Sequence, residues 1–205
     1  DLSKRIGVLA STLLGEPVRS VEIVSCGTLA SGPGAARGAA RLVQNGVLAG
    51  LLQSAMAETV NLVNAPVEAS ERGIGVVERT EASAEGWSAL IKVRVTGAKT
   101  SRDVWGTVFQ RSGPRIVRID EFEFEFIPEG QVLLIRNRDV PGMIGKFGTI
   151  LGKMNINIAS MQLGRRTKGS DALTVLNLDD EPDKAVVAAL VKEKNIISAT
   201  PLRFS

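Results

Sequence analysis

The feature that most constrains the fold is the order of hydrophobic periodicities along residues 130–205. Apolar residues three and four apart indicate a helix, whereas alternation or a short apolar run indicates a strand. Helical spacing appears between Met143 and Met154 and again between Lys184 and Asn195. The order strand, helix, strand, strand, helix, strand predicts the ferredoxin-like βαββαβ fold. The four predicted strands cover residues 132–137, 156–164, 172–178 and 196–204.

The earlier part of the chain shows helices first and then several strands. A short amphipathic helix is predicted for residues 4–14, a strand for residues 18–25, and two or three short helices within residues 31–73. From Ile74 the period changes to two, which continues to a run of phenylalanines alternating with glutamates in residues 121–126. Because these strands follow one another with short turns, an antiparallel sheet covered by helices on one face is expected.

Pro128-Glu129-Gly130 interrupts this pattern and predicts a domain boundary. We therefore expect an α+β protein with a first domain at residues 1–128 and a ferredoxin-like second domain at residues 129–205. The free edges of the second sheet favour pairing with another copy of the chain.

The composition excludes several classes of enzyme for this stretch taken alone. The chain has no His and one Cys, Cys26, so it lacks the commonest general acid or base and a Cys or His set for a metal. A Ser-His-Asp hydrolase, a His-dependent dehydrogenase and a zinc enzyme are excluded. The net charge is only +3, and six Phe, two Trp and no Tyr offer few stacking rings, so no nucleic-acid partner is expected.

The apolar runs are far shorter than the roughly 20 residues of a membrane span, so no membrane partner is expected. No export signal is visible, and a single thiol fits a reducing compartment. We therefore expect a cytoplasmic protein, with a plastid left open.

The sharpest local feature is the segment RNRDVPGMIGKFG at residues 136–148. Asp139 ends a strand, Pro141 stiffens the loop, and Gly142 and Gly145 let the backbone approach a ligand at the start of a helix. Amides at that helix end favour a carboxylate, and Asp139 favours an ammonium group. Together they describe a receptor for a free amino acid. The alternative is that Asp139 caps the helix and the glycines shape a turn.

Three segments resemble a known family. DVPGMIGKFGTILGKMNINIASMQLGR, residues 139–165, is similar to the ACT domain at the carboxyl end of D-3-phosphoglycerate dehydrogenases. Residues 58–78 and 113–130 resemble the intervening, or allosteric substrate binding, domain of the same family. The resemblance implies a regulatory, L-serine-sensing region of an NAD-dependent oxidoreductase that opens L-serine biosynthesis. NAD would belong to the parent enzyme, and this segment would carry no catalytic residue and no cofactor.

The resemblance also implies an L-serine site at an interface between ACT domains of a homo-oligomer. Asp139 would hold the amino group, the backbone of the following loop would hold the carboxylate, and Asn157 would reach the ligand across two chains. Asn137 would contribute mainly its main chain. The alternative for Asn157 is a solvated residue on the wet face of a strand. The residues implied for the site are Asn137, Asp139, Pro141, Gly142, Met143, Ile144, Gly145 and Asn157.

A second implied site would bind an anion in the first domain. Arg115 occupies the position of one cationic residue of the family, whereas a second such position falls at Ile127. Arg118 lies three residues further along the same strand, which predicts the opposite face, and it is interpreted as a solvated strand residue.

The glycines of GPGAARG, residues 32–38, mimic a dinucleotide-binding turn. They lack the strand immediately before them and the acidic residue about 20 positions later, so no cofactor site is expected there.

Two other functions stay open. Iron-sulfur L-serine dehydratases also join an intervening-type domain to an ACT domain, and a stand-alone amino-acid-binding module would need no catalytic partner. The neighbouring coding sequence would distinguish the first of these from a dehydrogenase.

Overall fold

The structure is a computed structural model of the chain, and it describes residues 1–30, 35–53 and 60–204. By contacts the chain divides into two compact units, Asp1–Asp120 and Glu121–Ser205, which are described separately. The predicted glycine-rich turn at residues 32–38 begins outside the described residues.

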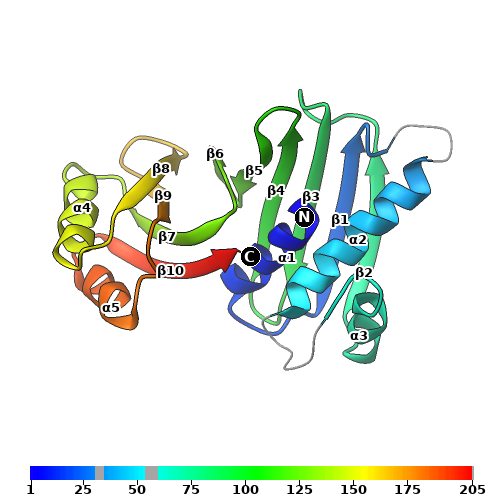
Figure 1. The fold of residues 1–205 in the computed structure, drawn as a ribbon, viewed down its shortest axis with the longest axis horizontal. Coiled ribbons are helices and arrows are strands. Elements are labelled where there is room, and N and C mark those ends of the chain that lie inside the picture. Colours follow the sequence, from blue (N-terminus) through cyan, green and yellow to red (C-terminus); the bar gives the residue numbers. More distant parts are fainter. Residues whose placement is uncertain (31–34, 54–59, 205) are drawn as a thin grey trace. The chain divides into compact units, whose positions relative to one another are not determined.

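The first unit is a sheet with helices on one face. The sheet runs in the order β2-β1-β3-β4-β5, and α1 and α2 lie across it (Figure 1). Its helices are α1 (Leu2–Leu14), α2 (Ala35–Gln53) and α3 (Ala65–Glu71), and its strands are β1 (Ser20–Gly27), β2 (Gly75–Glu81), β3 (Ala89–Thr96), β4 (Ser101–Phe109) and β5 (Gly113–Ile119).

One strand pair departs from the expected antiparallel arrangement. β1 and β2 are parallel, whereas the β1–β3, β3–β4 and β4–β5 pairs are antiparallel as predicted. Parallel strands need a long crossover connection, and the chain supplies one because α2 and α3 stand between β1 and β2. The mixed α and β class of the prediction is confirmed.

The two long helices of this unit cross at glycines. A Cβ atom built on Gly7 of α1 would lie 2.2 Å from the backbone oxygen of Val47, and one built on Gly50 of α2 would lie 2.0 Å from the backbone oxygen of Lys4. Both distances are far shorter than any van der Waals contact, so only glycine permits this approach. Ile6 and Leu9 of α1 are fully buried.

The carboxylate of Glu16 closes the turn between β3 and β4. It accepts hydrogen bonds from the backbone amides of Ala98, Lys99 and Thr100 at 2.9 to 3.2 Å, and from the Thr100 hydroxyl at 2.8 Å. The hydrogen bond from the Thr100 hydroxyl is the largest cause that lowers the pKa of Glu16 below its ordinary value; burial opposes it, and the three backbone amides lower the pKa further.

We expect Glu16→Gln to destabilise the chain at neutral pH, with a penalty that shrinks as the solution becomes acidic. A carboxyl group whose pKa is lowered on folding stabilises the fold above its unfolded pKa, and that contribution is lost as the pH falls through the folded pKa. Denaturant midpoints measured from pH 7 to pH 3 check this. Glu71→Gln, on the exposed surface of α3, is the control and should follow the wild-type profile. Parallel profiles for wild type and Glu16→Gln would contradict the assignment.

The second unit has the predicted βαββαβ order. Its strands run in the order β10-β7-β9-β8, and α4 and α5 pack side by side on one face (Figure 1). Apolar side chains of both helices and of β7 and β9 form one buried core, which includes Leu133, Phe147, Leu176 and Leu190. The elements are β7 (Gly130–Arg138), α4 (Met143–Lys153), β8 (Ile158–Arg165), β9 (Asp171–Leu178), α5 (Lys184–Lys192) and β10 (Ile196–Phe204).

A short strand, β6 (Phe122–Phe126), belongs by contacts to the second unit, where it lies against β8 and β9. The alternation predicted for it is confirmed: Phe122 and Phe126 are buried, and the intervening glutamates are exposed. Within the described part of the chain, no helix is both long and apolar enough to cross a membrane.

Candidate functional site

The connection from β7 to α4 carries most of the predicted site. Asp139 follows β7 directly, and Gly142 precedes the first residue of α4 with a φ of 90°, a left-handed conformation that favours glycine. The first backbone hydrogen bond of the helix runs from the Lys146 amide to the Gly142 oxygen at 3.1 Å. The amides of Met143 and Ile144 therefore have no acceptor inside the helix.

Among the residues that the structure describes, no side chain caps this helix end with a hydrogen bond. Gly142 offers no side-chain cap, and the first turn contains no acidic residue. Pro141, Ile144 and Gly145 are exposed, and a Cβ atom added at Gly145 would meet nothing within 4 Å. The positive end of the α4 dipole is thus open to an anionic group.

Asp139 is held in place by its own chain. Its Oδ2 atom accepts a hydrogen bond from Nη1 of Arg165 at 2.8 Å and another from the amide of Gly169 at 3.2 Å, and its own amide donates to the oxygen of Ser170. The bond from Arg165, followed by that from Gly169, lowers the pKa of Asp139. The group is therefore an ionised carboxylate at neutral pH. Its Oδ1 atom accepts no hydrogen bond from the described residues.

Asn137 has a buried side chain that is hydrogen-bonded inside the unit. Its Nδ2 atom donates to the oxygen of Arg138 at 2.8 Å, and its Oδ1 atom accepts a long hydrogen bond from the hydroxyl of Thr174 at 3.4 Å. The side chain is therefore committed to the protein, and a contribution of Asn137 through its main chain stays a prediction.

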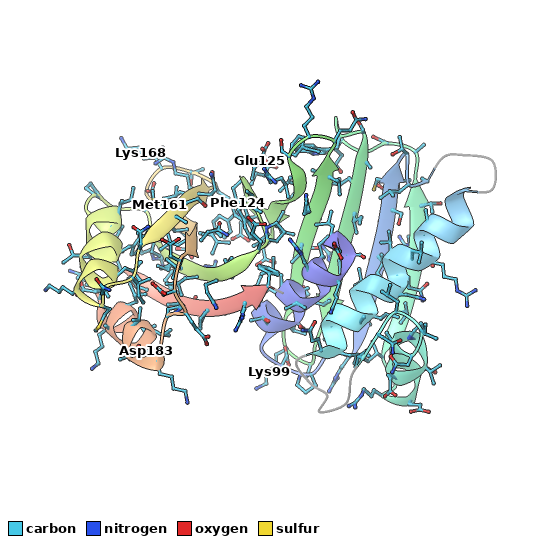
Figure 2. The ribbon with its side chains drawn as sticks, viewed as in Figure 1. Lys99, Phe124, Glu125, Met161, Lys168 and Asp183 are labelled. Atoms are coloured by element: carbon cyan, nitrogen blue, oxygen red, sulfur yellow. The ribbon has the colours of Figure 1, made fainter. Side chains whose placement is uncertain are left out.

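Asn157 lies at the other end of the sheet from Asp139. It precedes β8, and its Nδ2 atom donates to the carboxylate of Asp179 at 2.8 Å. The register places the start of β8 beside Leu178, whereas the end of β7 pairs with Asp171. Figure 2 shows the same separation, with Lys168 at one end of this unit and Asp183 at the other.

The eight residues of β8, at about 3.3 Å each, put these two ends roughly 25 Å apart. One chain therefore cannot bring Asp139 and Asn157 to the same small ligand. A site that uses both side chains needs two copies of the chain.

The two arginines of the predicted anion site lie on one face of the first sheet. Arg115 pairs with Thr107 of β4, and Arg118 pairs with Trp105. Trp105 and Thr107 are two residues apart and so point the same way. Val117 is an extra residue in β5, a bulge that returns Arg118 to the face of Arg115. The prediction of opposite faces is therefore wrong.

Both guanidinium groups have contacts within the first unit. The guanidinium carbon of Arg118 lies 4.4 Å from the centre of the Trp105 ring, and its Nε atom donates to the oxygen of Asp120. Arg115 donates to the oxygens of Ser112 and Pro114. Neither arginine forms an ion pair within the residues that the structure describes, and an anion site here stays a prediction.

Sequence reasoning did not identify Arg165 as a contact of Asp139. The available signal was the position of Arg165 as the last residue of β8, because β7 and β8 both pair with β9 and finish at the same end of it. Strand order alone, once known, would have placed the two side chains near each other.

Comparisons with known proteins cover the chain in two parts. A family model described as the D-3-phosphoglycerate dehydrogenase intervening domain matches residues 1–120, and the ACT domain model matches residues 131–195. D-3-phosphoglycerate dehydrogenase of Bacillus subtilis is 36% identical over 198 residues, which are 97% of this chain and 37% of that protein.

Two further relatives have the same name. The protein of Synechocystis is 39% identical over 150 residues, covering 73% of this chain and 27% of that protein. The protein of Methanocaldococcus jannaschii is 34% identical over 195 residues, covering 95% of this chain and 36% of that protein. The chain thus spans about a third of the length of the relatives it matches.

Proposed function

The chain belongs to the D-3-phosphoglycerate dehydrogenase intervening-domain family, and from that premise we propose that it is the amino-acid-sensing regulatory region of such an enzyme. The parent enzyme would oxidise 3-phosphoglycerate with NAD in the cytoplasm, and NAD would bind parts of the enzyme outside this segment. The names of the relatives support a dehydrogenase and do not favour the dehydratase alternative.

The proposed effector is L-serine, bound between two ACT domains. One observation carries this proposal: an ionised carboxylate, Asp139, lies on the same short connection as an uncapped helix end. A free amino acid presents the complementary charges, an ammonium group for Asp139 and a carboxylate for the amides of α4. The serine hydroxyl would be recognised by Asn157 of a second chain.

The edge strand β8 is the surface that we propose for pairing with that second chain. Its residues from Ala159 to Leu163 are exposed, and Met161 and Leu163 are apolar side chains with 36% and 38% of their surface accessible. An exposed edge with free backbone groups pairs readily with another strand. Antiparallel pairing of two copies of β8 would bring Asn157 of one chain toward the Asp139 end of the other.

Regulation would follow from linkage. A ligand shared by two chains stabilises the arrangement in which they are paired correctly, and it shifts activity only to the extent that it binds one arrangement better than another. A coupling free energy of about 1 to 3 kcal/mol is typical of such systems.

Calorimetric titration of the 205-residue chain with L-serine, D-serine, glycine and other amino acids tests this proposal. We expect L-serine to bind with one molecule per chain, and sedimentation to show a dimer that L-serine stabilises. No heat of binding with any amino acid at millimolar concentration would contradict the effector site. A chain that sediments only as a monomer, with and without L-serine, would contradict the site between two chains.

A further inference from the structure

Arg165 is hydrogen-bonded to the carboxylate of Asp139, which the proposed effector also needs as a partner. Its Nη1 atom donates to Oδ2 of Asp139 at 2.8 Å, and about half of the Arg165 side chain is accessible to solvent, against 19% for Asp139. The two residues come from different strands, because Arg165 ends β8 and Asp139 follows β7. A ligand ammonium group that approaches Asp139 therefore meets a guanidinium group already in contact with it.

We propose that Arg165 determines the specificity of this site by admitting ligands that carry a carboxylate and rejecting simple amines. The inference rests on the proposed function and adds a residue to it that neither the family comparisons nor the sequence analysis assigns. Its chemical basis is an exchange of partners around Asp139.

A zwitterion can exchange both partners at once. Its ammonium group replaces the guanidinium at Asp139, and its carboxylate gives the released guanidinium a new acceptor, in a geometry that guanidinium and carboxylate groups match well. An amine without a carboxylate breaks the same ion pair but offers the released guanidinium group of Arg165 no acceptor. It also enters a region where Lys168 adds a second positive charge near Asp139.

The surroundings allow this exchange without disrupting the fold. The Gly169 amide also donates to Oδ2 of Asp139, and the Asp139 amide donates to Ser170, so the loop stays attached when the guanidinium leaves. Exposed ion pairs contribute little to the stability of the fold, so the unit stays folded when Arg165 is released, although the ion pair still competes with a ligand amine for Asp139. The neighbouring cation of β7, Arg138, is paired with Asp171 and does not compete for Asp139.

The test compares L-serine with ethanolamine, which is serine without its carboxylate. Dissociation constants for both are measured by calorimetry, with displacement where binding is weak, on the wild-type chain and on Arg165→Gln. We expect Arg165→Gln to bind ethanolamine about three- to fivefold more tightly than wild type, so that the ratio of the ethanolamine constant to the L-serine constant falls by at least a similar factor. Arg165→Lys keeps a positive charge beside Asp139 but lacks the planar guanidinium group, so its ratio should lie between those of wild type and Arg165→Gln.

Arg166→Gln is the matched control, since it removes the charge of the next residue, which is also exposed, and should leave the ratio unchanged. A wild-type chain that binds L-serine, with no gain in ethanolamine affinity in Arg165→Gln, would overturn the role of Arg165 and leave the effector site intact. An equal gain in Arg166→Gln would overturn it as well, since net charge would then be the cause. Absence of L-serine binding in wild type and variant would overturn the proposed function and this inference together.

Discussion

Gly50→Ala is expected to lower the free energy of unfolding by about 3 kcal/mol, the upper part of the usual range for overpacking. The new Cβ atom would lie 2.0 Å from the backbone oxygen of Lys4 and 2.8 Å from the backbone nitrogen of Val8. Both are backbone atoms of α1, so no side-chain rotation relieves the clash. The gain in helix propensity from alanine is only about 1 kcal/mol and does not offset it.

Gly38→Ala is the control in the same helix. A Cβ atom at Gly38 would meet nothing within 4 Å, so the propensity gain is unopposed and stability should rise by up to about 1 kcal/mol. Chemical denaturation of both variants measures the two changes. Opposite signs support the close crossing of α1 and α2, whereas a neutral or stabilising Gly50→Ala would show that the helices do not approach as described.

Local sequence patterns were sufficient to predict the order of helices and strands in the second unit. Helical spacing from Met143 and alternation in the strands are short-range signals, and the βαββαβ order follows from them. The parallel β1–β2 pair could not be predicted in the same way, because partner choice depends on how α2 and α3 pack rather than on the residues of either strand.

The candidate site was predictable only where its chemistry is local. Asp139, Pro141 and the glycines of the β7–α4 connection form one continuous segment, so their pattern is visible in the sequence. The contact between Arg165 and Asp139 joins residues 26 positions apart, and it exists only because β7 and β8 run in the same direction and finish at the same end of the sheet. The bulge at Val117 leaves no local signal in the sequence of β5, and it places Arg118 on the same face as Arg115.

Asp139→Ala and Asn157→Ala are each expected to weaken L-serine binding about tenfold or more, the usual scale for losing a hydrogen bond to a charged or buried polar group. The first removes the partner of the ammonium group, and the second removes the contact from the other chain. Calorimetry on each variant measures the loss. Asp179→Ala removes the hydrogen bond between Asp179 and Asn157 but keeps the Asn157 side chain, so its smaller effect serves as the control.

The most direct test of the site between two chains combines the Asp139→Ala and Asn157→Ala substitutions in one dimer, each on a different chain. In a heterodimer of an Asp139→Ala chain and an Asn157→Ala chain, one site loses both residues, and the other keeps Asp139 from one chain and Asn157 from its partner. Heterodimers purified with two affinity tags should therefore bind one L-serine per dimer with wild-type affinity, although neither homodimer does. Heterodimers that bind L-serine as weakly as both homodimers would contradict a site formed by two chains.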